Sequence, residues 1–168
     1  MRRAAAILGS AIFLVLAPGT VAVLVPFWIS HWQPSPAASS PLLVIGILLI
    51  AAGGPVLLDS FARFALQGLG TPAPVLPPSR LVVTGLYRYV RNPMYVAVVS
   101  LILGQAAIFA NLRLAVYGLL VWLTFHLFTV LYEEPKLRAT FGGEYEGFCA
   151  AVPRWIPRFH PWRGPQAL

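Results

Sequence analysis

The sequence predicts an all-α integral membrane protein with about four transmembrane helices. Hydrophobic residues make up 58% of the 168-residue chain and charged residues only 10%, whereas charged residues make up roughly 25% of a typical soluble domain. Four long runs without Asp, Glu, Lys or Arg approach or exceed the roughly 20 apolar residues that a spanning helix needs. Backbone in lipid must satisfy its own hydrogen bonds, so we expect these runs to be helical. The runs are residues 4–30, 32–58, 92–112 and 114–132.

The predicted spans are 4–29, 42–62, 93–110 and 112–133. Together with their loops they form a single integral membrane domain that covers residues 1–168. The first span is longer than the roughly 7–15 apolar residues of a cleaved signal peptide, so we expect it to remain as a helix. In the second span, Gly53, Gly54 and Pro55 favour close helix contact and a kink.

The third and fourth spans are predicted to form an antiparallel hairpin with a tight turn near Asn111. Asn92 is a good N-cap for the third span, and Pro93 suits the first helical position. We expect the fourth span to stop before Pro135, because the residue before a proline disfavours helical backbone. After it, residues 134–150 can form one amphipathic helix at the membrane surface.

The distribution of charge predicts the topology. Of the 12 Lys and Arg residues, all but Arg113 lie in segments that the four spans place on one side. By the positive-inside rule this side is cytoplasmic and holds both termini; in a bacterium the membrane would be the inner (cytoplasmic) membrane. Topology and anionic lipids then account for the net charge of +7, and we predict no nucleic-acid partner. With Cys149 as the one cysteine, we predict no disulfide within the chain and no metal site, and no specific role for this thiol.

The stretch GLYRYVRNPMYV, residues 85–96, concentrates polar and aromatic side chains at the inner end of the third span. Because the hairpin returns after about 20 residues, Arg91 and Asn92 should lie at the same depth as Glu133 and Glu134. Two glutamates at a helix C-terminus oppose the helix dipole, so we expect an arginine or a ligand to compensate them. Neighbouring helical residues point about 100° apart, so one of the two glutamates can be structural.

Each of these groups also has a purely structural interpretation. The glutamate pair can be neutralised by Arg88, Lys136 or Arg138, and Arg91 can be an anchor at the inner membrane surface. The tyrosines of residues 85–96 can belong to the interfacial aromatic belt, or they can stack on a purine or a cationic ligand.

Two further polar groups lie within or next to the predicted spans. His126 lies inside the fourth span, where an ionisable residue is a functional candidate; the alternative is an interhelical hydrogen bond, for which Gln105 is the predicted partner. Asp59 and Arg63 are four residues apart at the inner end of the second span, so we expect them to form an ion pair.

The stretch GLYRYVRNPMYV, an apolar hairpin and the sequence YEEPKLRATFGGEYEGFCAAVPRWIP together resemble the isoprenylcysteine carboxyl methyltransferase and phospholipid methyltransferase superfamily. The resemblance covers about residues 66–158. The superfamily pattern is an arginine, a histidine or asparagine, proline-x-tyrosine, a hydrophobic stretch and a Glu-Glu pair. At the second position the chain has asparagine, which resembles the phospholipid branch more than the isoprenylcysteine enzymes. The matching residues are Arg91, Asn92, Pro93, Tyr95, Glu133 and Glu134.

The resemblance implies that the cofactor is S-adenosylmethionine and that Arg91, Glu133 and Glu134 are catalytic. It implies a cytoplasmic pocket formed by the 67–92 loop, the inner ends of the third and fourth spans, and the C-terminal tail. Part of this loop, GLGTPAP, resembles the glycine element of phospholipid N-methyltransferases. The implied cofactor-binding residues are Gly68, Gly70, Gly85, Tyr87, Arg91, Asn92, Pro93, Tyr95, Glu133 and Glu134.

The implied function is transfer of a methyl group to a lipid-like or otherwise hydrophobic acceptor, at a carboxylate oxygen or an amine nitrogen. The implied partners are the lipid bilayer and this acceptor. Two other classes remain open: a non-enzymatic or degenerate family member, and a sterol-reductase-like protein that binds NADPH. Sterol reductases are usually much larger than this chain. The sequence does not define the acceptor, the number of methyl transfers or the oligomeric state.

Overall fold

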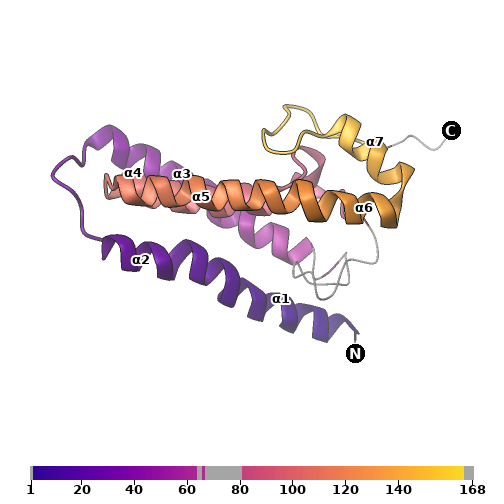
Figure 1. Ribbon diagram of the computed structural model, residues 1–168, viewed down its shortest axis with the longest axis horizontal. Coiled ribbons are helices and arrows are strands. Elements are labelled where there is room, and N and C mark those ends of the chain that lie inside the picture. Colours follow the sequence, from indigo (N-terminus) through magenta and orange to yellow (C-terminus); the bar gives the residue numbers. More distant parts are fainter. Residues whose placement is uncertain (1, 64–65, 67–80, 165–168) are drawn as a thin grey trace.

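The computed structural model describes residues 2–63, residue 66 and residues 81–164. It confirms the predicted all-α membrane fold: the described part consists of helices and connecting loops and contains no strand (Figure 1). The predicted glycines Gly68 and Gly70, and most of the 67–92 loop, lie outside the described residues. The helices are α1 (Arg2–Gly19), α2 (Val25–Ser30), α3 (Ser40–Arg63), α4 (Pro93–Ile108), α5 (Leu112–Phe128), α6 (Glu134–Phe141) and α7 (Gly143–Ala151).

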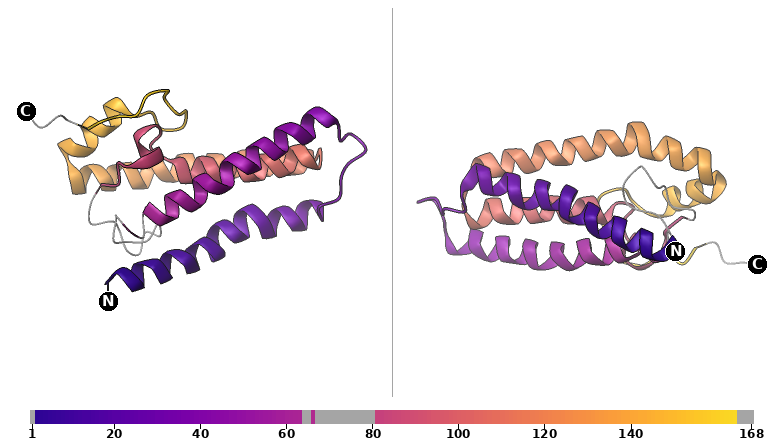
Figure 2. Two further views of the ribbon diagram at one scale, coloured as in Figure 1. Left: turned by 180° about the vertical axis from the view of Figure 1, so that it is seen from behind. Right: turned by 90° about the horizontal axis from the view of Figure 1, so that it is seen from below.

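In the described part of the chain, three helical runs are long and apolar enough to cross a membrane: Ile7–Ser30, Ser40–Arg63 and Leu112–Phe141. The third predicted span corresponds to α4, an apolar helix of 16 residues. Its length of about 24 Å is less than the roughly 30 Å of bilayer hydrocarbon. Figure 2 shows α3, α4 and α5 lying side by side, whereas α1 diverges from them toward its N-terminus. The four predicted spans are therefore three full-length helical runs and one shorter helix.

Two of the long runs contain a π-helical segment that ends two residues before a proline. Thr20–Leu24 precedes Pro26, and Thr129–Glu133 precedes Pro135. Proline lacks an N–H and its ring clashes with the carbonyl four residues earlier, and the wider π turn accommodates both defects. The prediction that the fourth span stops before Pro135 is therefore wrong, because the helix continues through this turn to Phe141.

The single amphipathic helix expected over residues 134–150 is also wrong. The chain turns at Gly142, where φ is 50°, a left-handed conformation that glycine adopts without steric strain. α6 therefore continues the line of α5, whereas α7 folds back beside it (Figure 1). Tyr145, Phe148 and Val152 form a small apolar core under this fold. We call the end of the bundle where α4 begins and α5 passes into α6 the site end.

α3 and α4 are closely packed because glycines face one another. A Cβ atom on Gly46 would lie 2.5 Å from the carbonyl oxygen of Gly104, and a Cβ atom on Gly104 would lie 2.9 Å from that of Gly46. A Cβ atom on Gly53 would similarly lie 3.1 Å from the carbonyl oxygen of Ala97, whereas a Cβ atom on Gly54 would face open space. Close helix contact at Gly53 is therefore observed, and small residues of this kind allow helices to pack in membranes.

Replacing Gly46 by alanine is expected to lower the free energy of unfolding by about 1–3 kcal/mol, because the new methyl group overpacks the interface with α4. The matched control is Gly54→Ala, which adds the same methyl group to open space on the same helix. We expect it to be neutral or stabilising, since glycine within a helix costs about 0.5–1 kcal/mol relative to alanine. Thermal unfolding in detergent micelles measures the stability of both variants. Equal unfolding midpoints for Gly46→Ala and Gly54→Ala would contradict the close packing of α3 and α4.

Candidate active site

The site end of the bundle brings together side chains that are distant in sequence. The Tyr95 hydroxyl on α4 donates a hydrogen bond of 2.7 Å to Glu133 at the end of the π segment. Arg91, just before α4, donates a hydrogen bond of 3.1 Å from Nη1 to Glu134. These contacts connect the start of α4 to the junction of α5 and α6. The motif residues of the two spans therefore form one cluster.

Glu134 is the centre of an arginine cluster. Its side chain is only 3% exposed, and it pairs with arginines from three segments of the chain. Arg154, after α7, donates from Nε at 2.6 Å and from Nη2 at 3.1 Å. Arg91 contacts the same carboxylate at 3.1 Å and Arg138 at 3.3 Å. Such charge-assisted bonds are the stronger kind in proteins. The Glu134 carboxylate is thus fully compensated by the protein itself.

The expected compensation of the glutamates is therefore only partly correct. Arg138 is a partner of Glu134, but Arg88 donates to the carbonyl of Trp162 and Lys136 lies over the Tyr132 ring. Sequence reasoning missed Arg154 because it is placed by the turn at Gly142 and the return of the chain, neither of which follows a periodic pattern.

Glu133 has a different environment from its neighbour. It accepts hydrogen bonds from the hydroxyls of Tyr95, at 2.7 Å, and of Thr129, at 3.3 Å. Within the described residues, no arginine or lysine forms an ion pair with it. The Tyr95 ring also stacks on Phe125, with the ring centroids 4.4 Å apart. Glu133 is thus a carboxylate oriented by two neutral donors, with capacity to accept from a further cationic or hydroxyl group.

Arg91 is held from several sides, but its buried Nε atom has no hydrogen-bond partner among the described residues. Its Nη1 contacts Glu134 and, at 2.8 Å, the sulfur of Cys149. Its backbone N–H donates to the carbonyl of Pro153. An unmet buried donor such as Nε is costly, and an anionic or carbonyl acceptor would satisfy it. The thiol, for which we predicted no role, is part of this arrangement.

The remaining predicted site residues of the described part line the same region. Asn92 occupies the N-cap position of α4, but its side chain donates to the carbonyl of Arg154 instead of capping the helix. Pro93 is fully buried at the helix start. Tyr87 is buried, and desolvation raises the pKa of its phenol well above the usual value. It therefore remains neutral at physiological pH.

Gly85 and its neighbours join the site to α3. Gly85 has a φ of 55°, and a Cβ atom there would overlap the guanidinium of Arg63. Arg63 in turn pairs with Asp59 at 2.7 Å, as the four-residue spacing predicts, and donates to the Thr84 hydroxyl. The left-handed backbone favours glycine here, and the missing side chain also lets the Arg63 guanidinium approach closely, whatever the relation of Gly85 to a cofactor.

No hydrogen bond joins His126 to Gln105 among the described residues, so the predicted partner is wrong. The His126 Nδ1 atom instead accepts a hydrogen bond of 3.1 Å from the indole of Trp155. Gln105 donates to the carbonyl of Ala22 and accepts from the indole of Trp32. The partner of the histidine comes from the C-terminal segment, residues 153–162 after α7. This segment has no periodic sequence pattern that would predict its position.

The C-terminal segment also holds the polar stretch before α4. Three backbone hydrogen bonds, each of 2.9 Å, join residues 88–91 to residues 153–162. They run from Arg91 N–H to the carbonyl of Pro153, from Arg158 N–H to that of Tyr89 and from Trp162 N–H to that of Arg88. The position of the site arginine therefore depends on chain that follows α7.

A helical membrane bundle that gathers arginine, tyrosine and glutamate side chains at one end is suited to bind a small polar ligand beside the bilayer. The chain belongs to the phospholipid methyltransferase family, whose model matches residues 42–144, more than half of the chain. This is a family of membrane methyltransferases within the superfamily that the motifs resemble. No curated protein and no solved structure matches the chain significantly. The family match includes every predicted site residue, whereas Arg154 and Trp155 lie beyond it.

Proposed function

We propose that the protein is an integral membrane enzyme that transfers a methyl group from S-adenosylmethionine to a lipid-like or otherwise hydrophobic acceptor. The observation that carries the proposal is the difference between the two adjacent glutamates. Glu134 is saturated by arginines, whereas Glu133 is oriented by Tyr95 and Thr129 and has no cation partner among the described residues. Membership of the family supports the proposal, since methyltransferases of this kind generally use this cofactor.

The residues at the site end fit the chemical groups of S-adenosylmethionine. The cofactor carries a carboxylate, an ammonium, a ribose diol, an adenine and a sulfonium, and when bound it supplies an activated methyl group. Arg91, whose Nε donor has no partner among the described residues, suits the carboxylate. Glu133 suits the ammonium or the ribose hydroxyls. Tyr95 orients Glu133 and is therefore a positioning residue.

Methyl transfer is an in-line displacement, and the protein contributes mainly orientation. At a carboxylate acceptor a C–O bond forms as the S–C bond breaks, and opposite charges are neutralised; a water-poor site favours this. At an amine acceptor the nitrogen gains the positive charge of the sulfonium, and a base removes a proton from this nitrogen before or after the transfer. Glu133 is better suited to receive this proton than Glu134, which is already bound by arginines. The same carboxylate therefore serves binding or proton transfer, depending on the acceptor.

A hydrophobic acceptor has a route to the site along α5. Leu123, Leu127 and Leu131 are 43%, 48% and 72% exposed and recur every four residues, so they form a strip on one side of the helix. This strip leads from the middle of the span to the level of Glu133. We propose that the acceptor approaches from the bilayer along it, whereas the polar cofactor enters from the cytoplasm.

The test is binding of S-adenosylmethionine to the detergent-purified full chain, measured by calorimetry, followed by transfer of labelled methyl groups into lipid vesicles. We expect saturable binding that is unaffected in the control Arg113→Ala, which lies at the opposite end of the bundle. A folded protein that binds no S-adenosylmethionine, even with lipid added, would overturn the proposal in favour of a non-enzymatic family member. Binding of NADPH in its place would favour the reductase.

A further inference from the structure

We propose that the segment 153–161, here called the C-terminal loop, inserts into the bilayer leaflet at the site end, with Ile156 and Phe159 as its lipid-contacting residues. The occupant of this surface is the lipid leaflet itself. The proposal goes beyond methyl transfer and does not depend on it, since it concerns a segment outside the family match.

The C-terminal loop has a defined position against the bundle. At its start the carbonyl of Pro153 accepts from the backbone of Arg91, and at its middle the backbone of Arg158 donates to Tyr89. The Arg158 side chain also donates, at 2.7 Å, to the carbonyl of Ala151 at the end of α7. The loop is therefore held in place by the same stretch that carries the candidate site.

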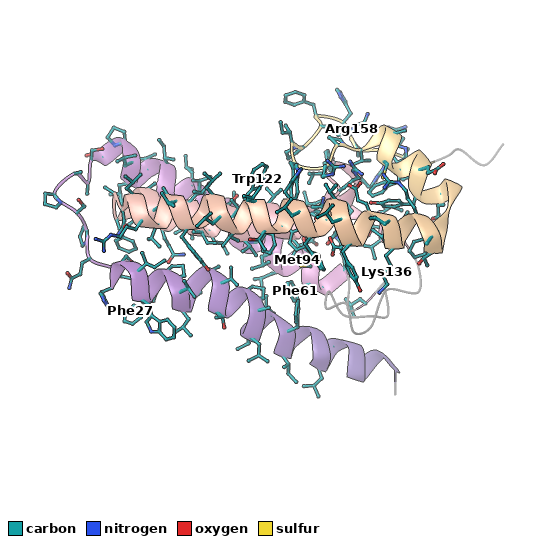
Figure 3. All side chains as sticks on the ribbon, in the orientation of Figure 1. Phe27, Phe61, Met94, Trp122, Lys136 and Arg158 are labelled. Atoms are coloured by element: carbon teal, nitrogen blue, oxygen red, sulfur yellow. The ribbon has the colours of Figure 1, made fainter. Side chains whose placement is uncertain are left out.

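Contacts with α5 place the loop at the depth of the membrane span. The Trp155 indole donates to His126 at 3.1 Å and packs edge-on against Trp122. Figure 3 shows Trp122 on α5 and Arg158 on the loop on the same side of the bundle. His126 lies 15 residues beyond Asn111, about 22 Å along the helix and so within the roughly 30 Å of hydrocarbon measured from that turn. Trp155 therefore contacts the helix closer to the middle of the membrane than Glu133 and its partners do.

Two large apolar side chains that follow Trp155 in the loop are mostly exposed. Ile156 is 78% exposed and Phe159 is 96% exposed. No Asp or Glu occurs anywhere after Glu146, whereas Arg158 and Arg163 lie in or beside the loop. Exposed apolar tips with a tryptophan and flanking basic groups have the chemistry of the interface between acyl chains and anionic headgroups.

Continuity with the lipid-facing surface of α5 favours the bilayer over a protein partner. Leu123 and Leu127 flank His126 on the helix and are themselves 43% and 48% exposed. A partner protein on the loop would have to displace lipid from this strip as well. The loop also connects the leaflet to the site, because Arg154, which precedes Trp155, binds Glu134.

Photo-cross-linking in vesicles of phosphatidylethanolamine and phosphatidylglycerol tests the proposal. A photoreactive benzophenone amino acid replaces Phe159 in the full chain, and mass spectrometry detects the adduct. Leu127 is the matched lipid-facing control, and Glu146, exposed on α7, is the matched control away from lipid. We expect lipid adducts at position 159 with a yield close to that at 127 and well above that at 146.

Two outcomes would overturn the proposal. One is a yield of lipid adduct at position 159 no greater than at position 146 while position 127 reacts normally. The other is an adduct between position 159 and a second protein chain, which would identify the loop as a protein interface. The readout is independent of methyl transfer, so an inactive but folded protein still gives a decisive result.

Discussion

Replacing Glu134 by alanine is expected to unfold the site end of the protein rather than only to weaken catalysis. The carboxylate is 3% exposed and joins three segments through Arg91, Arg138 and Arg154. Its removal would leave the Arg91 side chain, which is only 11% exposed, without its counter-ion. Breaking a buried ion pair from one side costs about 3–5 kcal/mol, so a large fall in the midpoint of thermal unfolding in detergent should result.

The arginines of the cluster provide the matched control. Arg138 contacts Glu134 one turn away on the same helix, and its side chain is 46% exposed. Exposed pairs of this kind contribute about 0.3–0.5 kcal/mol, so Arg138→Ala should leave the unfolding midpoint nearly unchanged. Arg154→Lys should be intermediate, because lysine cannot reproduce the two-point contact. If Glu134→Ala unfolds at the wild-type temperature, the cluster is not a structural element, and Glu134 returns as a candidate ligand for the cofactor.

The elements that could be predicted are those encoded by composition and local spacing. Charge-free runs predict the helices because hydrocarbon leaves the backbone no other partner. The Asp59–Arg63 pair follows from a single helical turn. The meeting of Arg91 with Glu134 follows from counting residues along two sides of a hairpin, since both sides have the same rise.

The contacts that could not be predicted depend on the segment after α7, which folds back on the bundle and has no periodic sequence pattern. Gly142 turns the chain back, and the return of the chain after α7 then places Arg154 on Glu134 and Trp155 on His126. The continuation of the helix through Pro135 was also not predicted. The rule that proline ends helices assumes α-helical geometry, whereas a π segment removes the clash.

The different roles of the two glutamates were also open at the level of sequence, because identical neighbours carry no signal of their partners. The expectation that the two side chains point in different directions agrees with their different partners, whereas the expectation that one of them is structural stays a prediction. Glu134 faces the arginines that return from the C-terminal segment and from α6, and Glu133 faces the hydroxyls of Tyr95 and Thr129. Under the proposed function, this contrast in partners assigns a folding role to Glu134 and a binding role to Glu133.

The contrast predicts the effect of Glu133→Gln, which keeps the shape of the side chain and removes its charge. The two hydroxyls contact different oxygens of Glu133. In the glutamine variant the amide oxygen can still accept from Tyr95, and the amide N–H group can donate to the Thr129 hydroxyl, which rotates to accept, so the unfolding midpoint should change little. A hydrogen bond between charged groups contributes about 1.5–3 kcal/mol. Loss of the proposed charged hydrogen bond between Glu133 and the cofactor should therefore weaken binding of S-adenosylmethionine by roughly 10- to 150-fold in calorimetry. The rate of methyl transfer should fall at least as far.

Glu144→Gln is the matched control, because it makes the same change on an exposed carboxylate of α7. We expect this variant to bind and to transfer methyl groups like the unaltered protein. Tyr95→Phe should weaken binding less than Glu133→Gln, because it removes the orienting hydroxyl and leaves the charge in place. If instead Glu133→Gln binds normally while a folded Glu134→Gln does not, then the arginine cluster, and not the carboxylate beside it, receives the cofactor. The choice between adjacent residues thus rests on one pair of isosteric substitutions, each measured for stability and for binding.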